Sequence, residues 1–202
     1  EVVDDFNNYF VTKVENIRSK FPCNDYEKID SAPSFKGEIL TSFAPASEEE
    51  ILSILKETEM KTSSVDPLPA SLMKDNLDIL LPALCELVNA SLSSGNIDGA
   101  KLAHITPLIK GRSLDHTNFK NYRPISNLSF IDTVDHSVLL SILEKELGIT
   151  GQALKWFRSF LSGRCQKVQI SGEESYEIII LFGVPQGSVL GPVLFNIYIR
   201  SL

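Results

Sequence analysis

The sequence predicts a mostly helical α+β protein, and three observations support this fold class. Apolar residues recur at helical spacing in the first half of the chain, two β-rich segments flank a polar turn later on, and helical spacing returns at the end. Helices grouped apart from strands, without a regular β–α alternation, are typical of α+β folds. The 202 residues are 43% hydrophobic and 22% charged, which is the composition of a globular protein long enough to bury a core.

The first elements are predicted as helices joined by polar stretches. Residues 3–20 place apolar side chains three and four positions apart, on one face of a helix. Residues 21–46 lack a period and are rich in turn-forming residues, so we expect a linker or an extended arm there. Ser47 then opens a capping box with Glu50, which predicts a helix over 48–58.

Two further helices and a strand are predicted in the middle of the chain. The helices are expected near 70–78 and 80–94, and Pro82 suits the first turn of the second because the first turn does not use its N–H groups. Residues 102–110 are predicted as a strand interrupted by Pro107.

The remaining elements alternate between helices and a hairpin. Gly148 is a natural left-handed stop for one helix, Thr150 can cap the next, and Pro192 suits the first turn of the last. The hairpin is predicted around the polar turn SGEES. These elements are a helix over 136–147, a helix over 151–162, strands at 165–171 and 176–183, and a helix over 193–202.

Isolated cysteines and histidines argue against a zinc site or a disulfide framework, because neither residue type occurs in a CxxC-like pair. Free thiols are typical of a reducing compartment, so we expect an intracellular protein, in the cytoplasm or the nucleus. No uninterrupted apolar run reaches the roughly 18 residues of a membrane span, and the start lacks a signal-peptide pattern. We therefore expect no membrane partner. The absence of an initiating Met predicts a fragment of a longer protein.

Charge is distributed unevenly, and the net charge of −7 disfavours general binding to nucleic acid. Residues 1–100 hold 8 Lys and Arg against 18 Asp and Glu, whereas residues 101–202 hold 11 against 8. A polyanion is therefore expected to meet the second half, with an ordinary solvated surface as the open alternative.

The segment GVPQGSVLGP, residues 183–192, is a candidate ligand loop. Gly183 and Gly187 allow close approach of the backbone to a ligand, and the amide of Gln186 offers donors and an acceptor. The alternative is a strand-to-helix turn that binds nothing.

Lys110 and Arg123 are two cations on either side of one polar loop. If the flanking segments pair as a hairpin, both can face a triphosphate, lysine as a point charge and arginine as a fork. The alternative is a pair of exposed charges on a surface ribbon.

The segment DTVDH, residues 132–136, places two carboxylates three positions apart. Asp132 and Asp135 could share a metal ion, or one of them could cap the helix that follows. A hydrolase triad of Ser188, His136 and Asp135 is disfavoured because no GxSxG elbow is present.

Taken in order, five segments resemble the reverse transcriptase domain of non-long-terminal-repeat (LINE-type) retrotransposons, which are RNA-directed DNA polymerases. The resemblance covers nearly the whole chain. The segments are SEEEILSILKETEMKTSSVDPLPASLMK, the pair LAHITPLIK and NYRPISNLSF, DTVDHSVLL, GITGQALKWFRSFLSGR, and GVPQGSVLGPVLFNIYI.

The resemblance implies roles for four residues. Lys110 and Arg123 match positions that face the phosphates of the incoming nucleotide, and Gln186 and Gly187 match the loop that packs on nucleotide and primer. It also implies an RNA template, a DNA primer, and two Mg²⁺ ions about 3.5–4 Å apart, held by carboxylates. The family takes those carboxylates from an Asp upstream of the DTVDH-like tail and from an Asp-Asp hairpin after the GVPQGS-like loop.

The family pattern breaks twice. Several dozen residues normally separate the NLSF-like and DTVDH-like segments, yet here only Ile131 lies between Phe130 and Asp132. The position of the first catalytic Asp falls on Ser126, or on Asn127 with a shift of one, and neither is an anionic metal ligand. The second break is that the chain stops before any Asp-Asp hairpin.

The resemblance therefore implies a partial polymerase fingers and palm behind a helical N-terminal extension. We expect residues 1–46 to form a helix plus linker, and 47–202 an incomplete reverse transcriptase domain with a deletion junction near 130–132. We expect no catalytic residues, no bound Mg²⁺, no polymerase activity, and weak or no binding of nucleic acid. The alternatives are a non-catalytic nucleic-acid-binding remnant and a retrotransposon relic with no selected function.

Overall fold

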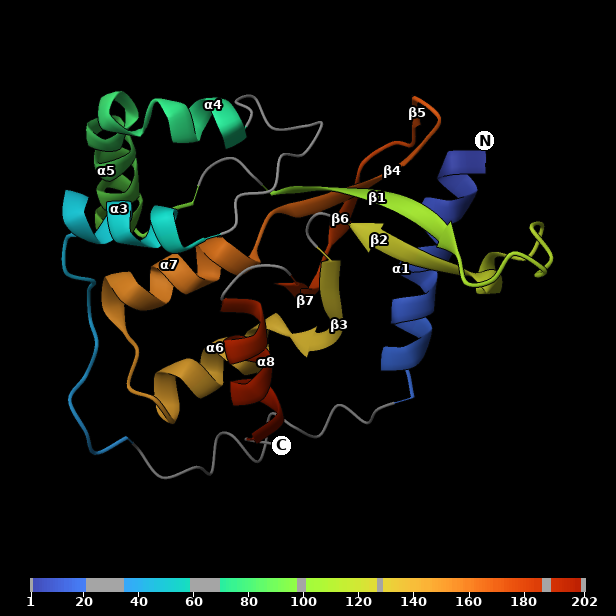
Figure 1. The fold of residues 1–202 in the computed structure, drawn as a ribbon. Helices are drawn as coiled ribbons and strands as arrows, with labels where there is room; N and C mark the ends of the chain where they lie inside the picture. The colour runs from blue at the N-terminus through green and yellow to red at the C-terminus, as the bar shows by residue number, and fades with distance from the viewer. Residues whose placement is uncertain are drawn as a thin grey trace.

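The chain has an α+β fold, as the sequence predicts (Figure 1). The structure is a computed structural model that describes residues 2–20, 35–58, 70–97, 101–126, 129–186 and 190–200. Over these residues it contains seven α-helices, one short 3-10 helix and seven strands, most of which fall where the sequence places them.

The main sheet is built around the central pair β1 and β4, which run parallel, with Leu102 opposite Cys165. Strand β2 pairs antiparallel with β1 at one edge, while β5 and β6 both pair antiparallel with β4. The pairing that was a condition for a shared role of Lys110 and Arg123 is therefore present. The hairpin predicted around SGEES is present in part, because residues 178–180 pair with β4 whereas residues 182–183 belong to another sheet. The strands are β1 (Leu102–Ile109), β2 (Tyr122–Ser126), β4 (Arg164–Ile170), β5 (Glu173–Glu174) and β6 (Ile178–Ile180).

Helix α1 (Val2–Arg18) covers one face of the main sheet. Its buried aromatic residues Phe6 and Phe10 pack with Ile105 of β1 and Val168 of β4. Asn7, on the same helix, is fully buried and belongs to a hydrogen-bond network with β4 and the segment that follows β5. The periodicity of the N-terminal segment thus predicted both the helix and its buried face.

Strands β3 (Ser129–Asp135) and β7 (Phe182–Gln186) form a separate two-stranded antiparallel sheet. The register shifts between Ile131 and Asp135, so the ribbon is irregular there. No strand was predicted over β3. Val134 holds the segment in place, because its side chain is fully buried in a second hydrophobic core, which is described next.

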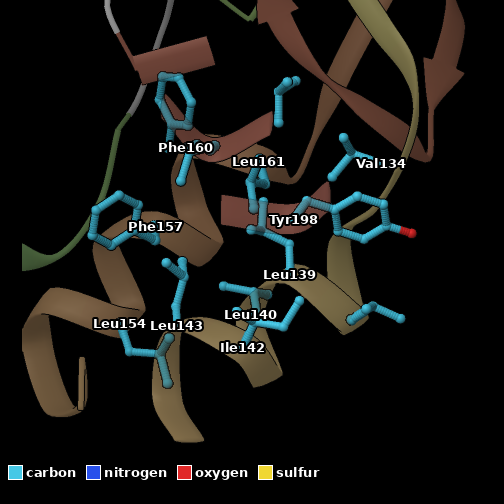
Figure 2. Packing of buried hydrophobic residues seen from close by; sticks show 13 residues of the cluster. Val134, Leu139, Leu140, Ile142, Leu143, Leu154, Phe157, Phe160, Leu161 and Tyr198 are labelled. Atoms are coloured by element: carbon cyan, nitrogen blue, oxygen red, sulfur yellow. The ribbon is translucent and has the colours of Figure 1, made fainter. Parts of the chain in front are cut away.

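The second core lies between β3, β7 and three helices: α6 (His136–Lys145), α7 (Gly151–Leu161) and α8 (Leu190–Arg200). Figure 2 shows apolar side chains from all three helices converging on this core. Gly148 ends the α6 region with a φ of +66°, as predicted for a left-handed stop.

Thr150 occupies the N-cap position of α7, but its hydroxyl makes no capping hydrogen bond, so the predicted cap is wrong in its chemistry. The backbone amide of Ala153, which such a cap would satisfy, donates instead to the carbonyl oxygen of Thr41 at 2.9 Å. Thr41 belongs to an extended arm over residues 35–46, in which Leu40 also bridges to Ile149. The predicted boundary between residues 1–46 and the domain over 47–202 stays a prediction.

Helix α3 (Glu48–Glu57) begins with the predicted capping box. The amide of Glu50 donates to Ser47 Oγ at 3.2 Å, and the amide of Ser47 donates to Glu50 Oε2 at 2.9 Å. Two orphan donors of the helix N-terminus are thereby satisfied.

Helices α4 (Ala70–Asp75) and α5 (Leu77–Ser94) follow, and α5 starts earlier than predicted. The carbonyl of Asn76 accepts from the amides of Ile79 and Leu80, which places the helix start before Pro82. Pro82 is therefore inside the helix, and its placement in the first turn is wrong.

Helix α5 is unusually apolar for a helix with so little buried surface. Leu81 is its one buried residue, whereas Ile79 and Leu87 are 77% and 68% exposed. By length and composition, this is the one helix in the described residues that passes the test for a membrane span, with a mean hydropathy of 1.3 over 18 residues. The search for uninterrupted apolar runs missed it because Asp78 and Glu86 interrupt the sequence.

Candidate functional site

The β1–β2 hairpin places Lys110 and Arg123 on the same face. Leu108 lies opposite Arg123 in the antiparallel register, and the amide of Lys110 donates to the carbonyl of Asn121 at 2.8 Å. Lys110 is thus the diagonal neighbour of Arg123, at a Cα separation of about 7–8 Å. The pairing on which their shared role depends is therefore present.

This face of the hairpin is exposed, whereas α1 covers the opposite face. Leu108 and Ile125, which share the face with the two cations, are 52% and 49% exposed. Lys110 Nζ donates to the carbonyl of Lys120 at 2.5 Å. Among the described residues, no carboxylate forms a salt bridge with Lys110 or Arg123.

The same face continues onto β4, where the positive charge is already compensated. Lys167 Nζ lies 3.5 Å from Glu174 Oε2 and 3.4 Å from Glu177 Oε1. His104 Nδ1 lies 3.8 Å from Glu174 Oε1 and makes no hydrogen bond with the described residues. The uncompensated positive charge of this face is therefore concentrated on the β1–β2 hairpin.

The loop between β1 and β2 is fixed by a turn that the sequence reading overlooked. The backbone amide and the hydroxyl of Thr117 donate to Asp115 Oδ1 at 2.9 and 2.7 Å, and Asn121 Nδ2 donates to the Asp115 carbonyl at 2.9 Å. The hydroxyl and then the amide of Thr117 hold the pKa of Asp115 below its ordinary value of 3.8. The Asp-His-Thr sequence is an Asx-turn pattern, from which this turn could have been predicted.

Gln186 lies on the other sheet. It is the last residue of β7 and pairs with Ser129 of β3, while its side chain and Gly187 lie outside the described residues. Only residues 127–128 separate β2 from β3, so the Cα atoms of Ser126 and Ser129 are at most about 11 Å apart. The structure thus brings Lys110 and Arg123 together and places Gln186 on a neighbouring ribbon.

Asp135 acts as a helix cap. Its Oδ1 accepts from the backbone amides of Ser137 at 2.9 Å and Val138 at 3.2 Å, and also from the Ser137 hydroxyl. A negative charge at this position also complements the helix dipole of α6. The capping alternative is therefore confirmed for Asp135, while the side chain of Asp132 lies outside the described residues.

The described residues do not fit a two-Mg²⁺ centre. No group of three or more His, Cys, Asp or Glu side chains in the described ranges is arranged to hold a metal ion. Of the disfavoured triad, His136 hydrogen-bonds through Nε2 to the carbonyl of Gly183 at 2.6 Å. Ser188 lies outside the described residues.

Arg164 is the most buried cation near this region, and it is structural. Its Nε donates to the carbonyl of Phe160 at 2.6 Å, and its guanidinium lies 4.6 Å from the centre of the Phe160 ring. Burial lowers the pKa of this guanidinium. Since Arg164 is only 4% exposed, it is not available to a polyanion.

Comparison of the sequence with protein-family models and with curated proteins found no match.

Proposed function

We propose that this chain is a derivative of a LINE-type reverse transcriptase domain that no longer polymerises and retains weak, phosphate-directed contact with nucleic acid. The observation that carries the proposal is the register of the β1–β2 hairpin, which sets Lys110 and Arg123 side by side on an exposed face. The resemblance of five segments, in the family's order, supplies the class of ligand.

The contact is expected to be weak. Two cations that neutralise two phosphates release few counterions, so the logarithm of the binding constant should fall with a slope of about −1.8 against the logarithm of salt concentration. The net charge of −7 opposes the approach of any polyanion. Binding should therefore be detectable only at low ionic strength, with an RNA template annealed to a DNA primer as the natural probe.

Loss of polymerase activity follows from the residues that replace the first catalytic Asp. The position falls on Ser126 or Asn127, whose neutral side chains cannot supply the negative charge that Mg²⁺ requires. Without that charge, the clamp on the attacking and leaving oxygens is missing, and several kcal/mol of transition-state stabilisation are lost. The expected loss of activity depends only on the deletion junction near 130–132.

Fluorescence anisotropy with a labelled primer–template tests the binding. Arg123→Ala and Lys110→Ala should each weaken binding and together flatten the salt dependence. Lys13→Ala is the matched control, because Lys13 is an exposed cation on α1, which covers the opposite face of the sheet. If binding is undetectable at about 50 mM salt, the phosphate-contacting role is refuted and the relic without a selected function is favoured.

Primer extension tests the loss of polymerisation. The purified chain, supplied with nucleotides and either Mg²⁺ or Mn²⁺, should extend no primer. Templated products that depend on the added chain would refute this part of the proposal, whatever the binding experiment shows.

A further inference from the structure

A pocket of about 720 Å³ lies beside the β1–β2 hairpin, and neither Lys110 nor Arg123 lines it. Residues from the first turns of α1, the loop over residues 111–121 and the β4–β5 turn line it. Its lining includes Tyr122 and Thr106, which lie on different faces of the hairpin because side chains alternate along a strand. A volume of this size is within the range of about 300–1,000 Å³ that small-molecule pockets occupy.

Aromatic rings form one wall of this pocket. The ring centre of Phe6 lies 4.5 Å from that of Phe119 and 4.8 Å from that of Tyr122. Phe6 is 5% exposed and belongs to the core, while Phe119 and Tyr122 are partly exposed. The wall is therefore aromatic carbon, in which two partly exposed rings contact the buried ring of Phe6.

The walls are held in place before any ligand arrives. Tyr122 Oη donates to the carbonyl of His116 at 3.1 Å, and the Asp115 turn fixes the same loop. On the other side, Ser171 and Gly172 form the two-residue turn between β4 and β5, with φ values of +52° and +89°. Positive φ at both positions is typical of a type I′ hairpin turn, which is a rigid connection.

Apart from the imidazole of His116, the polar side chains that line the pocket are hydroxyl and amide groups. Neither Lys, Arg, Asp nor Glu lines it. The side chains of Thr106, Gln169 and Ser171 form no hydrogen bond with the described residues, so their donors and acceptors are available. The pocket offers no Lys or Arg to a phosphate group. A neutral ring could stack on the aromatic wall and form hydrogen bonds with these polar side chains.

We propose that this pocket binds a neutral, planar heteroaromatic ring, of the class to which nucleobases belong. The ring stacks on the wall of Phe119 and Tyr122, since every base has a face that stacks on aromatic side chains. The amide of Gln169 offers a donor and an acceptor to the edge of the ring. Lys110 and Arg123 do not line this site, so binding of the ring does not depend on them.

Titration of the full chain with adenosine, followed by ¹H–¹⁵N correlation spectra, tests the proposal. Saturable shifts are expected at the amides of Phe119, Tyr122 and Gln169. Gln169→Ala should weaken binding about fivefold, the loss of one neutral hydrogen bond. Gln152→Ala is the matched control, because it removes a glutamine amide on α7, outside the pocket, and should leave the affinity unchanged.

Tyr122→Leu keeps apolar volume but removes the ring, and its spectrum reports whether the fold is intact. A folded Tyr122→Leu chain that binds adenosine as tightly as the original would overturn the stacking role. Equal affinity for cyclohexanol and adenosine would overturn the heteroaromatic class. The absence of saturable shifts up to about 10 mM adenosine would overturn the site itself, because such weak binding is not specific. Adenosine carries no phosphate, so these outcomes are separate from those of the primer–template experiment.

Discussion

The imidazole Nε2 of His136 lies 2.6 Å from the carbonyl oxygen of Gly183 and joins the start of α6 to strand β7. These two residues belong to the DTVDH and GVPQGS segments, which are 47 positions apart in the chain. Because the acceptor is a backbone carbonyl, Nε2 carries the proton in this contact. The histidine of the disfavoured hydrolase triad is thus a bridge between two structural elements.

His136→Ala should therefore lower the free energy of unfolding by about 0.5–1.5 kcal/mol, the range for one lost hydrogen bond. Chemical denaturation followed by circular dichroism measures this. His116→Ala is the matched control, because the His116 side chain is exposed on the β1–β2 loop. Equal midpoints for the original chain and His136→Ala would show that the bridge contributes nothing to stability.

The buried polar network around Asn7 leads to a second prediction. Asn7 Nδ2 donates to Ser175 Oγ at 2.8 Å and to the carbonyl of Tyr176 at 2.9 Å, and its Oδ1 accepts from Gln166 Nε2 at 2.7 Å. Asn7→Ala leaves these buried partners unsatisfied and should cost about 1–3 kcal/mol of unfolding free energy, measured by urea denaturation.

The neighbouring residue supplies the control for that experiment. Asn8 is exposed and accepts one hydrogen bond, from Tyr176 Oη at 2.6 Å. Asn8→Ala should cost less than about 0.5 kcal/mol, because water replaces the lost partner. A larger loss of unfolding free energy in Asn8→Ala than in Asn7→Ala would contradict the role of this network in holding α1 on the sheet.

Helix α5 allows a third prediction within one element. Leu81 is 8% exposed and Leu87 is 68% exposed. Leu81→Ala should lower the unfolding free energy by about 2–3 kcal/mol, whereas Leu87→Ala should change it by less than about 0.5 kcal/mol. Thermal and urea denaturation of both variants measure the difference. Similar losses at the two sites would mean that Leu87 is covered in solution.

The pKa of Asp115 leads to a fourth prediction. The hydroxyl and the amide of Thr117 favour the charged carboxylate, so the titration midpoint should lie below the ordinary 3.8. The stabilisation of the loop is therefore present above the pKa of the unfolded chain and is lost as the pH falls through the lower folded-state pKa. Carboxyl-detected NMR titration measures this midpoint.

Thr117→Val removes the hydroxyl, keeps the side-chain shape, and should raise the pKa of Asp115 toward its ordinary value. Thr58→Val is the control, because the Thr58 hydroxyl donates to the carbonyl of Ile54, on another helix end. An unchanged midpoint in Thr117→Val would rule out the hydroxyl as the main cause.

The hairpin that carries Lys110 and Arg123 was predictable because β-rich sequence on both sides of a polar loop leaves few alternatives to antiparallel pairing. The capping box at Ser47 and the left-handed Gly148 were predictable for the same reason, since each depends only on residues close in sequence. Local rules therefore recovered most helices and part of the hairpin around SGEES, and they allowed the β1–β2 pairing.

The misses come from contacts between distant residues. Thr150 does not cap α7 through its hydroxyl because Thr41, from the extended arm, satisfies the Ala153 amide instead. Strand β3 forms against β7, and no periodicity within residues 129–135 revealed that partner. The pocket beside Tyr122 gathers residues from α1, β1 and the β4–β5 turn, so its existence could not be predicted from any one segment.

The parallel pairing of β1 with β4 has a consequence for synthesis of the chain. Asn7 and Ser175 are 168 positions apart, and β4 supplies Val168 to the apolar side of α1. Helix α1 is synthesised before β4, so Phe6 and Phe10 stay uncovered until β4 has been made. Such late, long-range closure is slow and exposes apolar surface meanwhile. The apolar face of α1 in the nascent chain is therefore exposed to solvent until β4 has been synthesised.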